Sequence, residues 1–383
     1  MYFTSESVSE GHPDKICDLI SDAVLDEFLS NDPNAHVGCE CFITAKKLII
    51  SGEIKSTYKT DVEKLARSVL KNIGYDSNDK YLDYKTFPIE VIINKQSSEI
   101  DDVVTNSLDE QDIGAGDQGI MFGFATNRTH NYMPLPITIA HEIVNLASKL
   151  RKNGKFVDAY PDMKSQVTIQ FYNNQKDAKV DSIVLSFQCA KNIDLPQAKK
   201  FIIESIIKPV LECHNMTLPN LDKIYLNPFN IGGPVADTGL TGRKIIVDTY
   251  GGWSRHGGGA FSGKDPTKVD RSAAYAARYI AKNLVAAGIA DECEIQIGYV
   301  IGYSDPVSIC VNTFGTSKYS DDQIIKVIRE VFNLQPRKII ETLNLRKTKY
   351  FNTAAYGHFG QEEHNFSWEQ LNKVEEIKRK IIS

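Results

Sequence analysis

The order of the elements expected from this sequence returns three times, and this repeat constrains the fold more than any other feature. Paired apolar segments that read as β-hairpins begin near residues 38, 166 and 293, so the repeat is about 127 residues long, close to one domain. A predicted helix precedes and follows each hairpin. We therefore expect an α+β fold of three pseudo-symmetric β-α-β-β-α-β units, each a sheet covered by helices on one face. The uncovered sheet faces then need to pack against each other or against another subunit.

The individual elements are predicted from apolar periodicity and from the Gly, Pro and Asn residues at their ends. In the first unit we expect a helix, a hairpin, a helix and a strand, at 14–28, 37–44, 48–54, 60–73 and 88–94. The second unit adds a leading strand, and its elements are expected at 120–125, 136–150, 166–172, 180–189, 195–212 and 223–226. The third is expected at 244–250, 270–287, 293–301, 307–313 and 321–332, without a clear closing strand.

Charge and cysteine content exclude several classes of protein. The net charge of −5 gives no reason to expect a nucleic-acid-binding surface. The seven cysteines are odd in number, scattered and without a CxxC pair, which argues against a disulfide framework and against a zinc finger. The sequence has no basic-then-apolar leader and no membrane-spanning apolar run, so we expect a cytoplasmic protein without a membrane partner.

A glycine-rich stretch at 251–271 predicts a phosphate site. Six glycines fall between Gly251 and Gly263, and cations follow at Lys264, Lys268 and Arg271. Glycine backbones can approach a ligand closely, and the Asp265-Pro266 pair is typical of a helix start, with Asp as N-cap. The loop, the cations and the helix N-terminus together could form a binding site for a polyanionic phosphate. The alternative is a flexible surface loop.

The same stretch resembles a P-loop without completing the pattern. Residues 258–264 fit G-x-x-x-x-G-K, but the next residue is Asp265 rather than the Ser or Thr that reaches magnesium. A P-loop NTPase is therefore a rival interpretation, which the residue at position 265 disfavours. A second rival, a non-catalytic scaffold built on the threefold repeat, leaves the glycine and lysine loops unexplained.

Further chemistry-bearing side chains occur at the ends of predicted strands and helices, where sites gather on a rigid scaffold. His12 could donate a hydrogen bond to a departing oxygen, and Asp14 could hold Mg²⁺. Taken alone, the simpler interpretations are a loop histidine with a satisfied hydrogen bond and an N-cap aspartate. Glu40 and Glu53 lie on the two strands of the first hairpin, where solvent-facing positions are the simpler interpretation. Two further groups are the Asp162-Met-Lys164 run and a second glycine-rich loop at 230–244. Segment 97–119 is acidic, and we expect either a lid or a linker.

These motifs resemble those of the S-adenosylmethionine synthetase family, also called methionine adenosyltransferases. The matching runs are spread over most of the length of the chain, in family order, and lie at 5–15, 114–119, 231–234, 237–252 and 256–265. The resemblance implies that methionine sulfur attacks C5′ of ATP and displaces triphosphate, which the same site then hydrolyses to pyrophosphate and phosphate. It also divides the chain into units at 1–98, 112–230 and 231–371, with a mobile lid at 97–113.

The resemblance further implies roles for individual residues. Catalysis is assigned to His12, Lys164, Arg243 and Lys264. ATP contacts are assigned to His12, Asp162, Lys164, Phe229, Asn230, Asp237, Arg243, Lys244, Ala260 and Lys264. Methionine contacts are assigned to Glu53, Gln96, Asp237 and Lys268. Asp14 and Asp270 are implied as positions for two Mg²⁺ ions per active site, and Glu40 as the position for one K⁺ per subunit. Asp117 is implied to reach the active site of a neighbouring subunit, in a homodimer that pairs into a tetramer.

Overall fold

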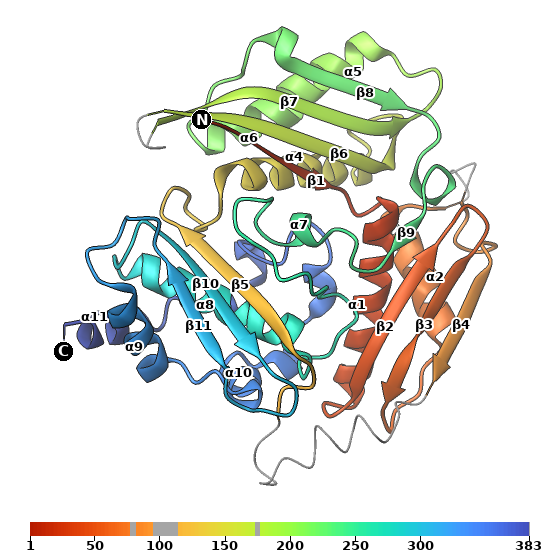
Figure 1. Cartoon of the computed structure of the whole chain (residues 1–383). Coiled ribbons are helices and arrows are strands. Elements are labelled where there is room, and N and C mark those ends of the chain that lie inside the picture. Colours follow the sequence, from red (N-terminus) through yellow and green to blue (C-terminus); the bar gives the residue numbers. More distant parts are fainter. Residues whose placement is uncertain (77–81, 95–113, 173–176, 383) are drawn as a thin grey trace.

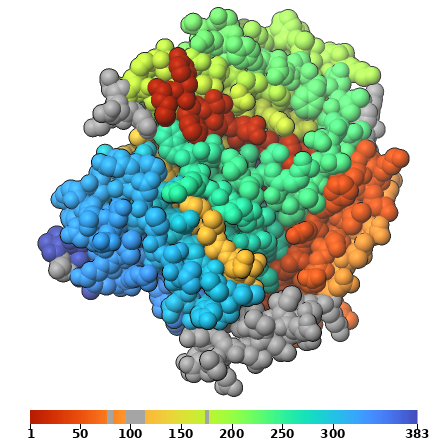
Figure 2. All heavy atoms as spheres, in the orientation of Figure 1, coloured from red at the N-terminus to blue at the C-terminus, as the bar shows by residue number. Residues whose placement is uncertain are grey.

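The computed structural model describes residues 1–76, 82–94, 114–172 and 177–382. In these residues the chain is a mixed α/β protein whose strands form three sheets. The sheets lie around the outside of the molecule, and α1 (Pro13–Asn31), α4 (Leu135–Lys152), α7 (Ile245–Asp248) and α8 (Val269–Ala286) lie between them (Figure 1). Figure 2 shows that the part of the chain around α7, coloured green to teal, fills the middle of this face.

The first sheet has the strand order β4-β3-β2-β9. Its strands are β2 (His36–Ile43), β3 (Leu48–Lys55), β4 (Ile89–Asn94) and β9 (Gly239–Leu240). Helix α1 packs on this sheet, and α2 (Val62–Ile73) packs on α1 and β4. Helix α2 begins at the N-cap Asp61, whose side chain accepts from the backbone of Lys64, and ends at Gly74 in the left-handed conformation. Cys39 and Cys41 lie buried on the helix-covered face, as alternation along a strand predicts.

The second sheet has the order β1-β6-β7-β8. Its strands are β1 (Tyr2–Val8), β6 (Ala159–Tyr172), β7 (Asp177–Cys189) and β8 (Ile224–Phe229). Helix α4 packs against β6 and β1, and the segment that contains α5 (Leu195–Ile202) and α6 (Lys208–Cys213) packs against α4. A separate apolar cluster lies under this sheet, and Trp253 packs against both it and the larger cluster that joins the first and third sheets.

The third sheet has the order β11-β10-β5. Its strands are β5 (Gly119–Thr126), β10 (Glu292–Tyr299) and β11 (Ser308–Asn312). Helix α8 packs on β5 and β10, and α9 (Asp321–Val331), which a Ser320–Gln323 capping box begins, packs on β11. The C-terminal helices α10 (Pro336–Thr342) and α11 (Val374–Lys380) pack on α8. Among the helices of the described residues, none combines the length and the apolar character that crossing a bilayer requires.

The three hairpins are confirmed, but the strand that leads each unit lies elsewhere than the sequence order predicts. Strand β1, which we did not expect, joins the second sheet by pairing with β6. Strand β5 joins the third sheet by pairing with β10, and the two-residue β9 joins the first sheet by pairing with β2. Local patterning identifies a strand but does not specify a partner more than a hundred residues away, which long-range packing selects.

Two local predictions in the third unit are wrong. The segment expected as a strand at 244–250 contains the short helix α7 instead. Its Ile-Ile-Val sequence favours a strand locally, so tertiary packing overrides the propensity here. The N-cap expected at Asp265 is also wrong, because α8 begins at Val269 with Lys268 as its N-cap. Asp265 is fully buried and accepts from the backbone of Val37 at 2.7 Å and of Thr267 at 2.8 Å.

Candidate active site

The start of α1 and the loop between β9 and α7 meet, and this contact brings three predicted site residues together. Lys244 Nζ lies 2.7 Å from Asp14 Oδ2, and Arg243 Nε lies 3.8 Å from Asp14 Oδ1. The backbone N–H of Leu240 also donates to Asp14 Oδ1 at 3.0 Å. Asp14 is almost fully buried, so this carboxylate holds the cationic loop against the helix. The alternative interpretation of Asp14 as an N-cap is wrong, because the N-cap of α1 is His12.

His12 is a neutral hydrogen-bond donor at the bottom of this site. Burial first, and then the nearby Lys244, Lys164 and Lys15, lower the pKa of His12 to about 2. Its Nδ1 accepts from the backbone N–H of Asp14 at 3.2 Å, so the single ring proton of the neutral imidazole is on Nε2. The approach of 3.8 Å between His12 and the Asp14 carboxylate is therefore not an ion pair. The geometry leaves one N–H group for an acceptor outside the helix.

The Asp162-Met-Lys164 run lies on β6 beside the same site. Asp162 Oδ2 accepts from the backbone of Gly233 at 2.8 Å, while the buried Oδ1 has no protein partner. Burial raises the pKa of Asp162 to about 6, against the opposing effects of the Gly233 hydrogen bond and of Lys164. Lys164 itself is exposed and pairs in register with Val8 of β1. A buried carboxyl group with an unpaired oxygen is typical of a site that binds a ligand.

The loop that carries Lys264 lies against the loop that carries Arg243 and Lys244. A Cβ added to Gly242 would lie 2.4 Å from the Cβ of Ala260, so the two loops touch there. Lys264 Nζ lies 2.5 Å from Asp270 Oδ2, in the first turn of α8, and Lys264 pairs with Gly38 of β2 through an isolated bridge. Lys268 is held by Asp265 at 2.7 Å. Each loop therefore has a lysine paired with a carboxylate, Lys264 with Asp270 and Lys244 with Asp14.

The other predicted site residues lie around this centre without a common contact. Phe229 ends β8, and Asn230 donates to the backbone oxygen of Cys189 at 3.1 Å. Asp237 is exposed and accepts from the backbone of Thr238 at 2.8 Å.

The remaining predicted residues lie on exposed surfaces or beyond the described residues. Glu40 and Glu53 are exposed on the uncovered face of the first sheet, and Asp117 is exposed before β5. Gln96 and the expected lid at 97–113 lie outside the described residues.

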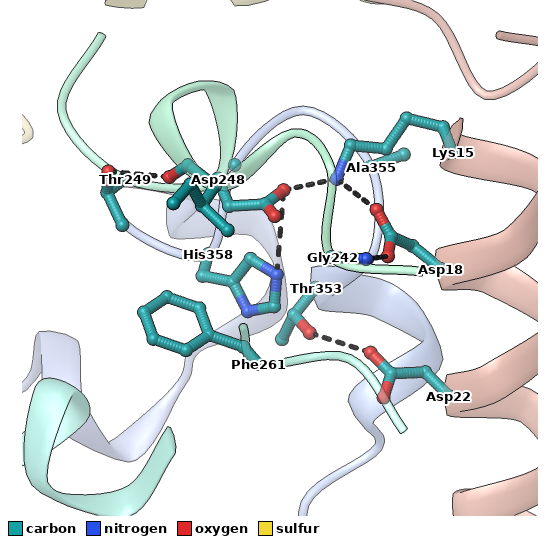
Figure 3. Close-up of polar contacts among 12 residues, drawn as sticks. Lys15, Asp18, Asp22, Gly242, Asp248, Thr249, Phe261, Thr353, Ala355 and His358 are labelled. Atoms are coloured by element: carbon teal, nitrogen blue, oxygen red, sulfur yellow. Dashed lines mark hydrogen bonds and ion pairs between the residues drawn. The ribbon is translucent and has the colours of Figure 1, made fainter. Parts of the chain in front are cut away.

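A buried ionic network behind the site was missed at the level of the sequence (Figure 3). Lys15 is fully buried, and its ammonium group contacts Asp248 and lies 3.0 Å from Asp18 Oδ2. Burial alone would lower the pKa of Lys15, but the two carboxylates raise it above its usual value. Burial raises the pKa of Asp248 to about 7, and His358 lies 3.8 Å away with its pKa held well below its usual value by burial.

A second buried pair continues the network along α1. Arg271 donates to both oxygens of Asp22, at 2.7 and 2.9 Å, and to the hydroxyl of Thr353 at 3.0 Å. Both partners are fully buried, so neither can be removed without leaving an unpaired charge. The signal that could have found this network is the four-residue spacing of the aspartates along the helix at 14–26, which places them on one face.

Several cations gathered beside carboxyl groups are typical of an enzyme that acts on a phosphorylated substrate. Three models of S-adenosylmethionine synthetase domains match this chain. The N-terminal domain model matches residues 1–98, the central model 112–231 and the C-terminal model 231–370. The chain therefore belongs to the S-adenosylmethionine synthetase family.

Curated relatives extend over nearly the whole chain. The chain is 55% identical over 381 residues to an S-adenosylmethionine synthase of Mesoplasma florum, a match that covers 98% of this chain and 99% of the relative. It is 51% identical to an S-adenosylmethionine synthase of Clostridium tetani, with 99% of each chain covered.

Proposed function

We propose that this protein is a methionine adenosyltransferase, which forms S-adenosylmethionine from ATP and L-methionine and then hydrolyses the bound triphosphate to pyrophosphate and phosphate. The observation that carries the proposal is the convergence of Lys164, Arg243 and Lys244 on the neutral His12, in a chain of this family. Methionine sulfur would form a bond to C5′ of ATP while the C5′–O bond breaks, and the triphosphate leaves with the bonding electron pair. Charge then develops on the leaving oxygen, where preorganised donors lower the barrier most.

In this scheme the chain's own residues divide the work. The Nε2–H of His12 would donate to the departing 5′-oxygen, because Nδ1 is already used within the helix cap. Lys164, Arg243, Lys244 and Lys264 would neutralise the triphosphate, and Asp162, Phe229, Asn230 and Ala260 would contact ATP. Methionine would lie near Glu53, Gln96, Asp237 and Lys268. A carboxylate at this place favours the sulfonium ion that forms there.

Divalent and monovalent cations would complete the site. We propose two Mg²⁺ ions at Asp14 and Asp270, and one K⁺ at Glu40. The donor set fits, because Mg²⁺ is commonly held by one or two carboxylates together with phosphate oxygens, and each of the two aspartates stands beside a lysine that a phosphate would also attract. Within the described residues no cluster of three or more His, Cys, Asp or Glu side chains could hold a metal by itself. When bound, Mg²⁺ would stabilise charge on the phosphate oxygens.

The assembly is proposed from the sheet faces and the family. We take the units as 1–98, 112–230 and 231–371, related as three β-α-β-β-α-β folds that exchange their leading strands, with a lid at 97–113. Exposed apolar side chains on and beside the uncovered sheet faces, Phe42, Ile92, Ile120, Leu240 and Ile301, favour a homodimer with Asp117 at a shared site, paired further into a tetramer. The seven cysteines are all free, which supports a cytoplasmic location.

The rival P-loop interpretation is disfavoured by the same geometry. In a P-loop the residue after the lysine supplies a hydroxyl group to magnesium and the loop leads directly into a helix. Here that residue is Asp265, whose side chain is buried and occupied by backbone donors, and α8 begins only at Val269.

Product identity separates the two interpretations. The protein is incubated with ATP, methionine, Mg²⁺ and K⁺, and every product is quantified. We expect one S-adenosylmethionine, one pyrophosphate and one phosphate per ATP, without ADP, and almost no ATP loss when methionine is omitted. A P-loop enzyme cleaves between the β- and γ-phosphates. ADP that appears at the rate of ATP loss, with or without methionine, would contradict the proposed function.

A further inference from the structure

Four aspartates of α1 follow one another at intervals of four residues. Asp14, Asp18, Asp22 and Asp26, called here the α1 aspartates, therefore lie along one face of the helix. Like charges at this spacing destabilise a helix, and the burial of an unpaired carboxylate costs far more. Since Asp14, Asp18 and Asp22 are nearly or fully buried, partners must compensate for this arrangement.

The partners are backbone N–H groups of segments that lie more than two hundred residues away in sequence. Each α1 aspartate accepts from a different place in the C-terminal part of the chain. The donors, in order along α1, are Leu240 at 3.0 Å, Gly242 at 2.8 Å, Gly263 at 2.8 Å, and Tyr350 and Phe351 at 2.8 and 3.0 Å. The helix thus serves as a support on which several loops are held in a fixed order.

The second and third donors each stand one residue before the cations of the proposed phosphate site. Gly242 precedes Arg243, and Gly263 precedes Lys264. Both glycines have positive φ, 78° and 80°, and a Cβ on Gly263 would lie 1.8 Å from the backbone oxygen of Cys39, so each loop has little freedom at its point of attachment. A shift of either attachment point would move the adjacent cation directly.

We propose that Asp18 and Asp22 are positioning residues that hold the two glycine-rich loops on α1, so that the loop cations meet the triphosphate together. Asp18 also forms an ion pair with Lys15, and Asp22 also forms an ion pair with Arg271. The inference rests on the proposed function for the identity of the bound anion and for the reaction, but the attachment of the loops is a separate property. Small displacements of binding groups have large kinetic effects, because reacting atoms must be held within narrow limits.

Asp18→Asn tests the inference, with Asp26→Asn as its matched control. One oxygen of Asp18 accepts from Gly242 and the other from Lys15, and a single amide oxygen cannot serve both donors. Asp26 lies on the same face of the same helix and also accepts from a backbone N–H group, but the segment that it holds, at Tyr350, carries no proposed site residue. We expect Asp18→Asn to lower kcat by about 10- to 100-fold and to weaken the affinity for inorganic triphosphate, measured by calorimetry, by roughly 10-fold. Asp26→Asn should leave both within about twofold.

A milder variant keeps the test valid if Asp18→Asn does not fold. The hydroxyl group of Ser21 lies 2.7 Å from that of Thr241, in the same loop, so Ser21→Ala loosens the attachment without burying an unpaired charge. It should lower kcat and triphosphate affinity by a few-fold, with the KM for methionine unchanged and the thermal midpoint only slightly lowered, because only hydrogen bonding between neutral groups is lost.

The outcomes separate this inference from the proposed function. Equal losses of kcat and triphosphate affinity in Asp18→Asn and Asp26→Asn would overturn the positioning role. If Asp18→Asn does not fold, wild-type kcat and triphosphate affinity in Ser21→Ala would overturn it. A methionine KM that rises as much as kcat falls would indicate general distortion and overturn it too. A wild-type protein that binds triphosphate but forms no S-adenosylmethionine would overturn the proposed function alone, and the triphosphate affinities would still decide the positioning role.

Discussion

Replacement of Asp162 by asparagine, at the proposed ATP site, should make this protein more stable and less active. The buried carboxyl group of Asp162 has a pKa of about 6, because burial disfavours its ionised form. The difference from the usual value near 4 corresponds to a penalty of about 3 kcal/mol for holding the charge in the folded protein. Asparagine has no charge to bury, but its NH₂ group would take the place of the buried Oδ1, which has no partner. A buried donor without an acceptor costs about 1 kcal/mol of stability. The net gain is about 2 kcal/mol at pH 8.

The gain should depend on pH in a defined direction. Because the folded-state pKa of Asp162 is raised, the ionised side chain destabilises the fold above about pH 6, and this penalty disappears as the pH falls through the unfolded-state value near 4. The stability difference between variant and wild type should therefore be largest at pH 8, smaller at pH 5 and absent or reversed near pH 3.5.

Urea unfolding at these pH values measures the difference, with ATP turnover assayed alongside. Asp181→Asn on the neighbouring strand is the control, because Asp181 pairs with Lys223 at 2.6 Å and its loss should slightly destabilise the protein. If Asp162→Asn were less stable than wild type at pH 8, with a difference that does not change with pH, the reasoning about this buried charge would be refuted.

Two further predictions concern the proposed triphosphate site and the assembly. Lys264→Met should remain folded, because its ion pair with Asp270 is partly exposed, but its kcat should fall by about 10²- to 10³-fold. The control Lys47→Met, which removes the exposed ion pair with Glu90, should keep wild-type turnover. A folded Lys264→Met with the wild-type rate would contradict the assignment of Lys264 to the triphosphate site. Sedimentation at micromolar concentration should give at least a dimer, and a fully active monomer of 42.8 kDa would contradict the shared site.

Local sequence patterns were sufficient to predict the repeating hairpins. Alternation of apolar residues bounded by turn residues identified the pairs that the structure confirms as β2 with β3, β6 with β7, and β10 with β11. Both strands of a hairpin are close in sequence, so the turn and the pattern together specify the pairing. The motif runs likewise pointed to the family that the domain models match.

The strands that lead each sheet could not be assigned in this way. Strand β1 pairs with β6, about 160 residues later, and β5 pairs with β10 across a similar separation. A strand's own residues carry its tendency to be extended and its buried face, whereas the choice among distant partners depends on which helices cover each sheet. For the same reason the segment at α7, rich in β-branched residues, is a helix in the centre of the molecule.

The sequence by itself therefore determined the types of side chain in the candidate site, and the tertiary structure decided their chemical states. A histidine before Asp14 is visible in the sequence, but its neutral Nε2–H form follows from burial among lysines that come from other segments. The regular spacing of the α1 aspartates is also visible, whereas their partners appear only when loops more than two hundred residues away fold onto the helix. Protonation and positioning depend on the charges and dipoles that surround a group in space, and sequence distance does not measure that surrounding.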